Sequence, residues 1–266
     1  MQLENLTYRV CDLSRTTGQF IREQCGLFSE KKVEKKGRHD LVSYVDRTAE
    51  MMIINTLKKF LPEAGIIAEE SGSDIADQYN WIIDPLDGTT NFVHGVPVYA
   101  ISIALKRDNE LILGVVYEIN QNECFYAWED GPAYLNLEKI TVSTADKLDN
   151  SLLATGFPYS DFSRMIPYLA FFEHLMQNSR GLRRLGSAAV DLAYVACGRF
   201  EAFYEYGLNP WDVAAGAFIV QQAGGKITRF DGSTEAVFGK DIIASNGKIH
   251  QEMLQMIQQF EGLIVK

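Results

Sequence analysis

Apolar side chains recur at the period of an α-helix over the first part of the chain. Their spacings of three and four residues place them on one face, which predicts an amphipathic helix. A second helix of the same kind opens around Asp46 and ends before Pro62. The positions that define the two faces are Leu6, Val10, Leu13, Thr17 and either Phe20 or Ile21, and then Ala49, either Met52 or Ile53, Thr56 and Phe60.

Short apolar runs bounded by turn residues predict strands between and after these helices. Segments 33–36 and 41–45 flank Gly37-Arg38 and predict a β-hairpin. Asp108-Asn109 separates the two longest runs and predicts a tight turn, so that the first half of the chain carries an antiparallel sheet. The predicted strands after the hairpin are residues 66–68, 81–84, 98–106, 111–117 and 124–127.

From about residue 151, strands and helices alternate, which predicts an α/β layer. Ser187 is typical of a helix N-cap, and Gly198 and Gly224 are typical of helix ends. Because no repeat or flexible linker interrupts the chain, we predict one domain over residues 1–266, with subdomains of about 1–145 and 146–266. The elements predicted here are strands 152–156, 201–204 and 242–245, and helices 165–177, 187–197, 212–222 and 248–260.

Composition places the chain among globular proteins, since 47% of its 266 residues are hydrophobic and 23% are charged. No apolar run approaches the ~18 residues of a spanning helix, and charges within the first fifteen residues argue against a signal peptide, so we expect a cytoplasmic protein without a membrane partner. The net charge of -10 argues against a nucleic-acid surface. The basic cluster of Lys31, Lys32, Lys35, Lys36 and Arg38 is either a solvated hairpin or an aid to anion binding.

Acidic residues follow an apolar strand at residues 81–84. Asp84 stands at its end, Pro85 interrupts pairing, and Asp87 comes three residues later, so both carboxylates are expected to face one point. Gly88 allows close approach of the backbone to a ligand, and the amides of residues 88–90 would form a nest for a phosphate if they open a helical turn. Alone, this pattern is more often a capped loop than a ligand site, because Asp and Gly are ordinary turn residues.

Two more acidic segments strengthen the pattern. Glu69-Glu70 follows a short strand and Asp212 opens a helix of small residues, although the first could be a solvated turn and the second only a helix cap. Two carboxylates ~5 Å apart repel by about 3 kcal/mol at an effective dielectric constant of 20, so clustered acids need protonation or a cation. Carboxylate oxygens without competing His or Cys favour Mg²⁺ or Mn²⁺ over zinc.

Three ordered motifs carry a resemblance to a known family, the inositol monophosphatases: residues 84–92 (DPLDGTTNF), 69–72 (EESG) and 211–216 (WDVAAG). Segments 40–46, 156–158 and 183–189 extend the similarity over nearly the whole chain. The resemblance implies an α+β or α/β layered sandwich with alternating αβαβα layers and mixed sheets, a metal site where the two halves meet, and a homodimer. It also implies Mg²⁺-dependent, lithium-sensitive hydrolysis of a phosphate monoester.

Residue roles follow from the same resemblance, position by position. The metal ligands would be the side chains of Glu69, Asp84, Asp87 and Asp212 and the carbonyl of Leu86, holding two or three Mg²⁺ ions. Gly88 and Thr89 would bind the phosphate, and the catalytic residues would be Asp46 and Thr89, which orient and activate the attacking water, together with Glu69. Ser187, Ala188 and Glu205 would contact the substrate body.

The sequence thus favours a phosphatase for a small polyol or sugar phosphate, with myo-inositol 1-phosphate as the first candidate and attack by a metal-activated water. Fructose 1,6-bisphosphate and 3′-phosphoadenosine 5′-phosphate remain alternatives within the superfamily. An alternative of another class is a non-catalytic regulatory or binding partner with a vestigial site. The intact set of acids counts against that class.

Overall fold

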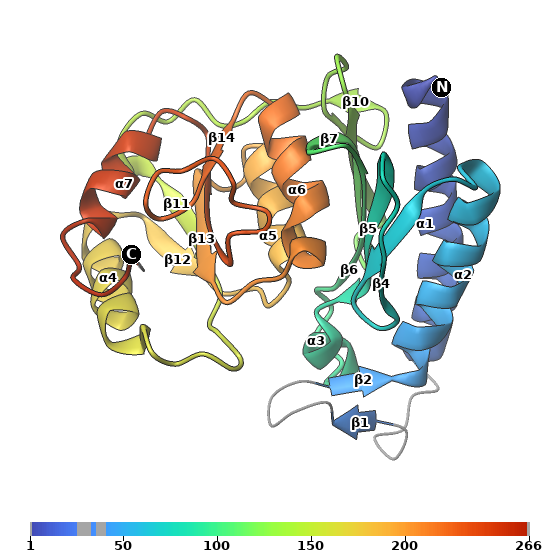
Figure 1. Cartoon of the computed structure of the whole chain (residues 1–266). Coiled ribbons are helices and arrows are strands. Elements are labelled where there is room, and N and C mark those ends of the chain that lie inside the picture. Colours follow the sequence, from blue (N-terminus) through green and yellow to red (C-terminus); the bar gives the residue numbers. More distant parts are fainter. Residues whose placement is uncertain (1, 26–32, 36–40, 265–266) are drawn as a thin grey trace.

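Five layers of alternating helices and sheets build the molecule (Figure 1). The computed structural model describes residues 2–25, 33–35 and 41–264. From the N-terminal side the layers are a helix pair, an eight-stranded sheet, a second helix pair, a five-stranded sheet and a third helix pair. This arrangement confirms the layered αβαβα sandwich with mixed sheets.

The first layer contains α1 (Leu3–Cys25) and α2 (Tyr44–Phe60), as the apolar periodicity predicts. Leu6, Val10 and Ile21 are buried in α1, so the predicted face is the one that packs on the sheet. The hairpin β1 (Val33–Lys35) and β2 (Leu41–Ser43) pairs antiparallel. Its predicted turn and most of the basic cluster lie outside the described residues, and the side chain of Lys35 is not described.

The large sheet has the strand order β10-β9-β8-β7-β6-β5-β3-β4 and is antiparallel except where β3 runs parallel to β5. Asp108, with φ 53°, and Asn109 form the predicted two-residue connection between β6 and β7. The strands are β3 (Gly65–Ala68), β4 (Gly72–Asp74), β5 (Tyr79–Asp87), β6 (Ala100–Arg107), β7 (Glu110–Glu118), β8 (Glu123–Trp128), β9 (Tyr134–Leu135) and β10 (Glu138–Lys139).

The second half forms a mixed sheet of order β12-β11-β13-β15-β14. Strand β11 runs parallel to both neighbours, and β15 runs antiparallel to both of its own. The strands are β11 (Leu152–Thr155), β12 (Gly181–Arg183), β13 (Ala202–Tyr206), β14 (Lys226–Thr228) and β15 (Asp241–Ser245), and the helices are η2 (Leu148–Asn150), α4 (Met165–Asn178), α5 (Ala188–Ala196), α6 (Pro210–Gln222) and α7 (His250–Ile257).

Helices α5 and α6 pack between the two sheets, and their apolar core joins side chains of both. Small residues allow this double packing, since Ala214, Ala215 and Ala217 are all buried in α6. Ser187 caps α5 by accepting a hydrogen bond from the Val190 amide, as predicted. Within the described ranges, the helices are too short or too polar to cross a membrane.

Candidate active site

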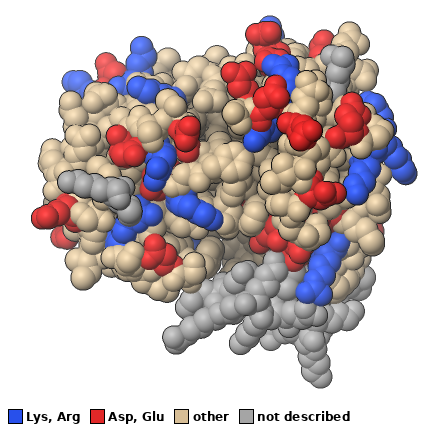
Figure 2. Space-filling model, in the orientation of Figure 1, with Lys and Arg blue, Asp and Glu red and all other residues tan. Residues whose placement is uncertain are grey.

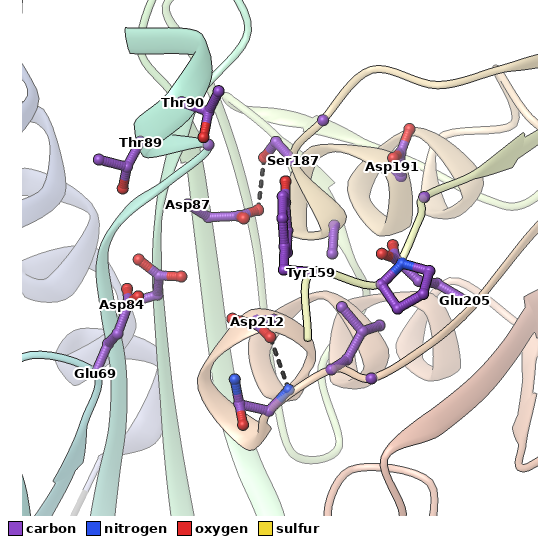
Figure 3. Close-up of a pocket in the computed structure, with 18 of the residues that line it drawn as sticks. Glu69, Asp84, Asp87, Thr89, Thr90, Tyr159, Ser187, Asp191, Glu205 and Asp212 are labelled. Atoms are coloured by element: carbon purple, nitrogen blue, oxygen red, sulfur yellow. Dashed lines mark hydrogen bonds between the residues drawn. The ribbon is translucent and has the colours of Figure 1, made fainter. Parts of the chain in front are cut away.

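A pocket of about 410 Å³ lies where the two halves of the chain meet (Figures 2 and 3). Basic and acidic side chains are intermixed over both halves on the face that Figure 2 shows. The first half contributes the turn after β3, the end of β5 and the start of α3 (Thr89–Val93). The second half contributes loop residues 156–160, residues 184–191, and segments 205–209 and 212.

The irregular end of β5 places Asp84 and Asp87 at the pocket. Strand pairing with β6 shifts register between these two residues, because Pro85 cannot donate to the ladder and the chain bulges there. The strand therefore continues through Asp87, which corrects the prediction that it ends at Asp84. The Leu86 amide donates to Asp84 Oδ1 at 2.9 Å, which holds the bulge closed.

Gly88 joins this strand to α3 with a φ of 98°, a conformation that favours glycine. A Cβ at this position would stand 3.0 Å from the Val98 carbonyl oxygen and 3.3 Å from that of Gly186. The predicted helical turn is present, and as at any helix start its first amides have no preceding helical acceptor. The backbone can thus present donors to the pocket.

Asp87 joins the two halves of the molecule. Its Oδ2 accepts hydrogen bonds from Ser187 Oγ at 2.6 Å and from the Ala189 amide at 2.7 Å, both at the start of α5. Burial raises the pKa of Asp87 to about 6, against the lowering effect of these two donors and of Arg184. Ser187, expected to contact substrate, lines the pocket with its hydroxyl already committed to Asp87.

Asp212 is both a cap and a pocket residue. It occupies the third position of α6, where its Oδ2 accepts from the Asn209 amide at 2.7 Å, and it faces the same pocket as Asp87. Burial and then repulsion from Asp87 raise the pKa of Asp212 to about 7. Asp212 is therefore a helix cap, as one interpretation of the sequence has it, and its place at the pocket leaves its role as a metal ligand a prediction.

The four predicted acidic ligands, Glu69, Asp84, Asp87 and Asp212, line this one pocket (Figure 3). Burial, followed by repulsion from the other three, raises the pKa of Asp84 well above its usual value. Oxygen donors that repel one another in a buried site fit a hard divalent cation, because an ion would offset their charge. Within the described ranges, however, no three acidic, His or Cys side chains lie close enough to hold an ion together. One oxygen of Asp87 and one of Asp212 accept from backbone amides.

Thr89 connects the pocket to Asp46. Its hydroxyl lies 2.9 Å from Asp46 Oδ1 and 3.0 Å from the Leu86 carbonyl oxygen, so it can donate to one of them at a time. Asp46 is buried in the first turn of α2 and is not among the residues that line the pocket. The hydroxyl is thus placed to pass a proton from the pocket toward a carboxylate behind it.

The far end of the pocket combines Glu205 with groups that sequence reasoning missed. Burial raises the pKa values of Glu205 and Asp191, which Arg184 opposes in both cases. Arg184 donates to the Tyr159 hydroxyl at 3.3 Å, and Asp191 Oδ1 is buried with no hydrogen-bond partner among the described residues. Gly156 leaves room for Glu205, since a Cβ there would stand 2.0 Å from its Oε2.

All of the residues predicted for the site line the pocket except Asp46, which contacts the pocket residue Thr89. Leu86, Gly88 and Ala188 line the pocket with the four acids. Of the missed residues, Arg184 lies inside the 183–189 motif and could have been found from its position there, whereas Asp191 lies two residues past its end. Tyr159 lies in a loop that carries no such signal.

Comparison with known proteins gives a consistent result. The profile of the inositol monophosphatase family matches residues 2–262. A putative Nus factor SuhB from Neisseria meningitidis is 43% identical over 92% of this chain and 94% of its own, and a fructose-1,6-bisphosphatase/inositol-1-monophosphatase from Thermotoga maritima is 43% identical over 85% and 86%. The crystal structure of SuhB from Bartonella henselae superposes with a TM-score of 0.90 at 36% identity, covering 97% of this chain and 99% of that one.

Proposed function

The chain belongs to the inositol monophosphatase family, and from that premise we propose that it is a Mg²⁺-dependent phosphatase for a small polyol phosphate. The first candidate substrate is myo-inositol 1-phosphate. The observation that carries the proposal is the convergence of Glu69, Asp84, Asp87 and Asp212, from four separate segments, on one pocket at the junction of the halves.

The proposed metal ligands are these four side chains and the Leu86 carbonyl. Bound Mg²⁺ would supply electrostatic stabilisation of the charge that develops on the phosphoryl oxygens and on the attacking and leaving oxygens. The family is generally dependent on this metal. Two or three ions, and inhibition by lithium, stay predictions.

The chain's own residues position the water and move its proton. A water in the pocket beside Thr89 can donate to the Thr89 hydroxyl, whose hydrogen then points to Asp46 at 2.9 Å. The buried carboxylate accepts the proton as attack proceeds, which is general-base catalysis through a relay. The amides of Gly88 and Thr89 are proposed to hold the phosphoryl oxygens, because both residues line the pocket at a helix start.

The far end of the pocket suits a hydroxyl-bearing body. Glu205 and Asp191 place two carboxyl groups beside the single guanidinium of Arg184. A second phosphate group would bring its negative charge to the end of the pocket that holds these two acids, whereas a hydroxyl can donate to or accept from either. This favours a polyol monophosphate over fructose 1,6-bisphosphate, which remains an alternative because a relative carries both names. A 3′-phosphoadenosine 5′-phosphate activity remains the other alternative within the superfamily.

A phosphate-release assay over these three substrates tests the proposal, with Mg²⁺ present or removed by EDTA. We expect turnover of inositol 1-phosphate that Asp87→Asn lowers by about 10²-fold or more, the scale of losing one element of transition-state stabilisation. Activity that persists in excess EDTA, or an Asp87→Asn variant as active as the parent chain, would refute the metal assignment. The homodimer expected from the resemblance stays a prediction that light scattering would check.

Relatives named Nus factor SuhB support a second candidate, a binding role that needs no turnover. Exposed apolar side chains on and before α4 offer a surface for it, with Ile166 at 85% exposure and Phe162 at 51%. A partner that binds equally well to an Asp84→Asn, Asp87→Asn double variant would favour this candidate. Loss of binding in that variant would tie the role to the pocket.

A further inference from the structure

Helix α2 carries two buried carboxylates one turn apart, and each contacts a segment that lines the site or adjoins it. Asp46 and Glu50 are separated by four residues and therefore lie on the same face. Asp46 is 1% exposed and accepts from Thr89, whereas Glu50 is 3% exposed and accepts from the Glu70 amide through Oε2 at 2.9 Å. The first contact belongs to the proposed proton relay, and the second has no assigned role.

The contact of Glu50 fixes the short turn that carries Glu69. Strands β3 and β4 pair up to Ala68 and Gly72, so only residues 69–71 form the turn between them. The Glu69 amide donates to the Ile83 carbonyl of β5 at 3.3 Å, and the next amide donates to Glu50. The backbone is thus held on both sides of the Glu69 side chain, by the sheet and by α2.

Burying the Glu50 carboxylate costs free energy of folding unless hydrogen bonds such as the one from the Glu70 amide offset it. Removing a charged side chain from water is offset only by hydrogen bonds that satisfy it, and an apolar residue would pack here at lower cost. Glu50 lines a second hollow of about 340 Å³, outside the main pocket, together with Arg47, Met51, Ile54 and Glu70. Met51 and Ile54 give that hollow apolar neighbours, so packing alone does not require an acid at this position.

We propose that Glu50 is a positioning residue that orients Glu69 toward the metal of the active site. The inference rests on the proposed metal role of Glu69. Helix α2 would then position two parts of the site: Asp46 holds the Thr89 hydroxyl of the proton relay, and Glu50 holds the turn that carries Glu69. Residues that orient ligands in this way commonly change metal affinity by about 10- to 100-fold when they are lost.

The test compares Glu50→Ala with Glu50→Gln in the full chain, with Glu118→Ala as a matched control. Glu118 is also buried and accepts from a backbone amide, that of Gln121, but it does not line the pocket. Two readouts are followed: the Mn²⁺ concentration that gives half of the maximal rise in melting temperature, and hydrogen exchange at the Glu70 amide.

In Glu50→Ala we expect that Mn²⁺ concentration to rise about tenfold and protection of the Glu70 amide to fall by a similar factor. Activity at saturating Mg²⁺ should recover to within about threefold, because the ligands themselves remain. Glu50→Gln keeps an oxygen acceptor and should restore both readouts to within about twofold. If the alanine variant does not fold, Glu50→Asp withdraws the carboxylate by one methylene and takes its place.

Unchanged Mn²⁺ response and exchange in Glu50→Ala would overturn the positioning role, as would an equal change in Glu118→Ala. Failure of the proposed substrate is a separate outcome. A chain that binds Mn²⁺ but hydrolyses none of the tested esters would lose the proposed activity and keep the role of Glu50. If Mn²⁺ fails to stabilise the parent chain, the metal assignment and the positioning role fall together.

Discussion

Burial of the pocket acids, and then repulsion among them, should make the metal-free protein less stable as the pH rises, and Asp212→Asn should remove part of this penalty. The pKa of Asp212 is raised to about 7 from a usual value of 3.8, first by burial and then by Asp87. In this pH window the unfolded chain gives up its proton before the folded one. Stability is therefore highest near pH 4 and falls as the pH rises through about 7.

The size of the effect follows from these two pKa values. One pKa unit corresponds to 1.36 kcal/mol, so a fully realised shift from 3.8 to about 7 would cost about 4 kcal/mol above pH 7. The Asp212 side chain is partly exposed, and solvent screens the repulsion, so we expect about 2 kcal/mol. Asparagine keeps an oxygen that accepts from the Asn209 amide, so the cap is preserved.

Urea unfolding in EDTA, from pH 4 to pH 8.5, measures this directly. Asp212→Asn should be about 2 kcal/mol more stable than the parent chain at pH 8 and within about 0.5 kcal/mol of it at pH 4. Asp231→Asn is the control, because hydrogen bonds from Ser233 lower the pKa of Asp231. Its substitution should therefore make the chain less stable at pH 8, the opposite of the effect expected for Asp212→Asn. An Asp212→Asn variant no more stable than the parent at pH 8 would refute the repulsion argument, as would a difference that does not change with pH.

Three further predictions concern other residues. Thr89→Ala should lower kcat about 10²-fold in the phosphate-release assay and Thr89→Ser less than tenfold, because serine keeps the hydroxyl of the relay; equal losses would contradict the relay. Gly156→Ala should raise KM for inositol 1-phosphate about tenfold by displacing Glu205, while KM for a small aryl phosphate changes little. Burial lowers the pKa of His250 from 6.5 to about 4. The stabilisation that neutral His250 gives the folded chain is therefore complete above pH 6.5, and up to about 3 kcal/mol of it is lost as the pH falls to 4. The urea midpoint of His250→Gln should depend less on pH over this range than that of the parent chain.

Elements with a strong local signal could be predicted from the sequence. Helix α5 has a capping serine at one end and a glycine at the other, and the β6–β7 hairpin has polar turn residues between two long apolar runs. The short strands β4, β9, β10, β12 and β14 were missed. They contain two or three residues each, and a stretch of that length is too short to show an alternation.

The site residues differ in the same way: those with a local sequence signal could be predicted, and those brought to the pocket by the tertiary fold could not. Asp84, Asp87 and Gly88 stand close in sequence at a strand end, where turn chemistry indicates a ligand. Tyr159 and Arg184 reach the pocket only because β11 and β12 lie side by side in the second sheet, an order that local sequence does not determine. The bulge at Pro85 was misread as a strand end because a proline is compatible with both.

The hydrogen bonds from the Ser187 hydroxyl and the Ala189 amide to Asp87 mean that the proposed active site is assembled from both halves of the chain. A gene split near residue 145 would give one product with Glu69, Asp84 and Asp87 and another with Asp212 and Glu205. We expect neither product alone to hydrolyse a phosphate ester, so colour released from a chromogenic ester would report their reassociation.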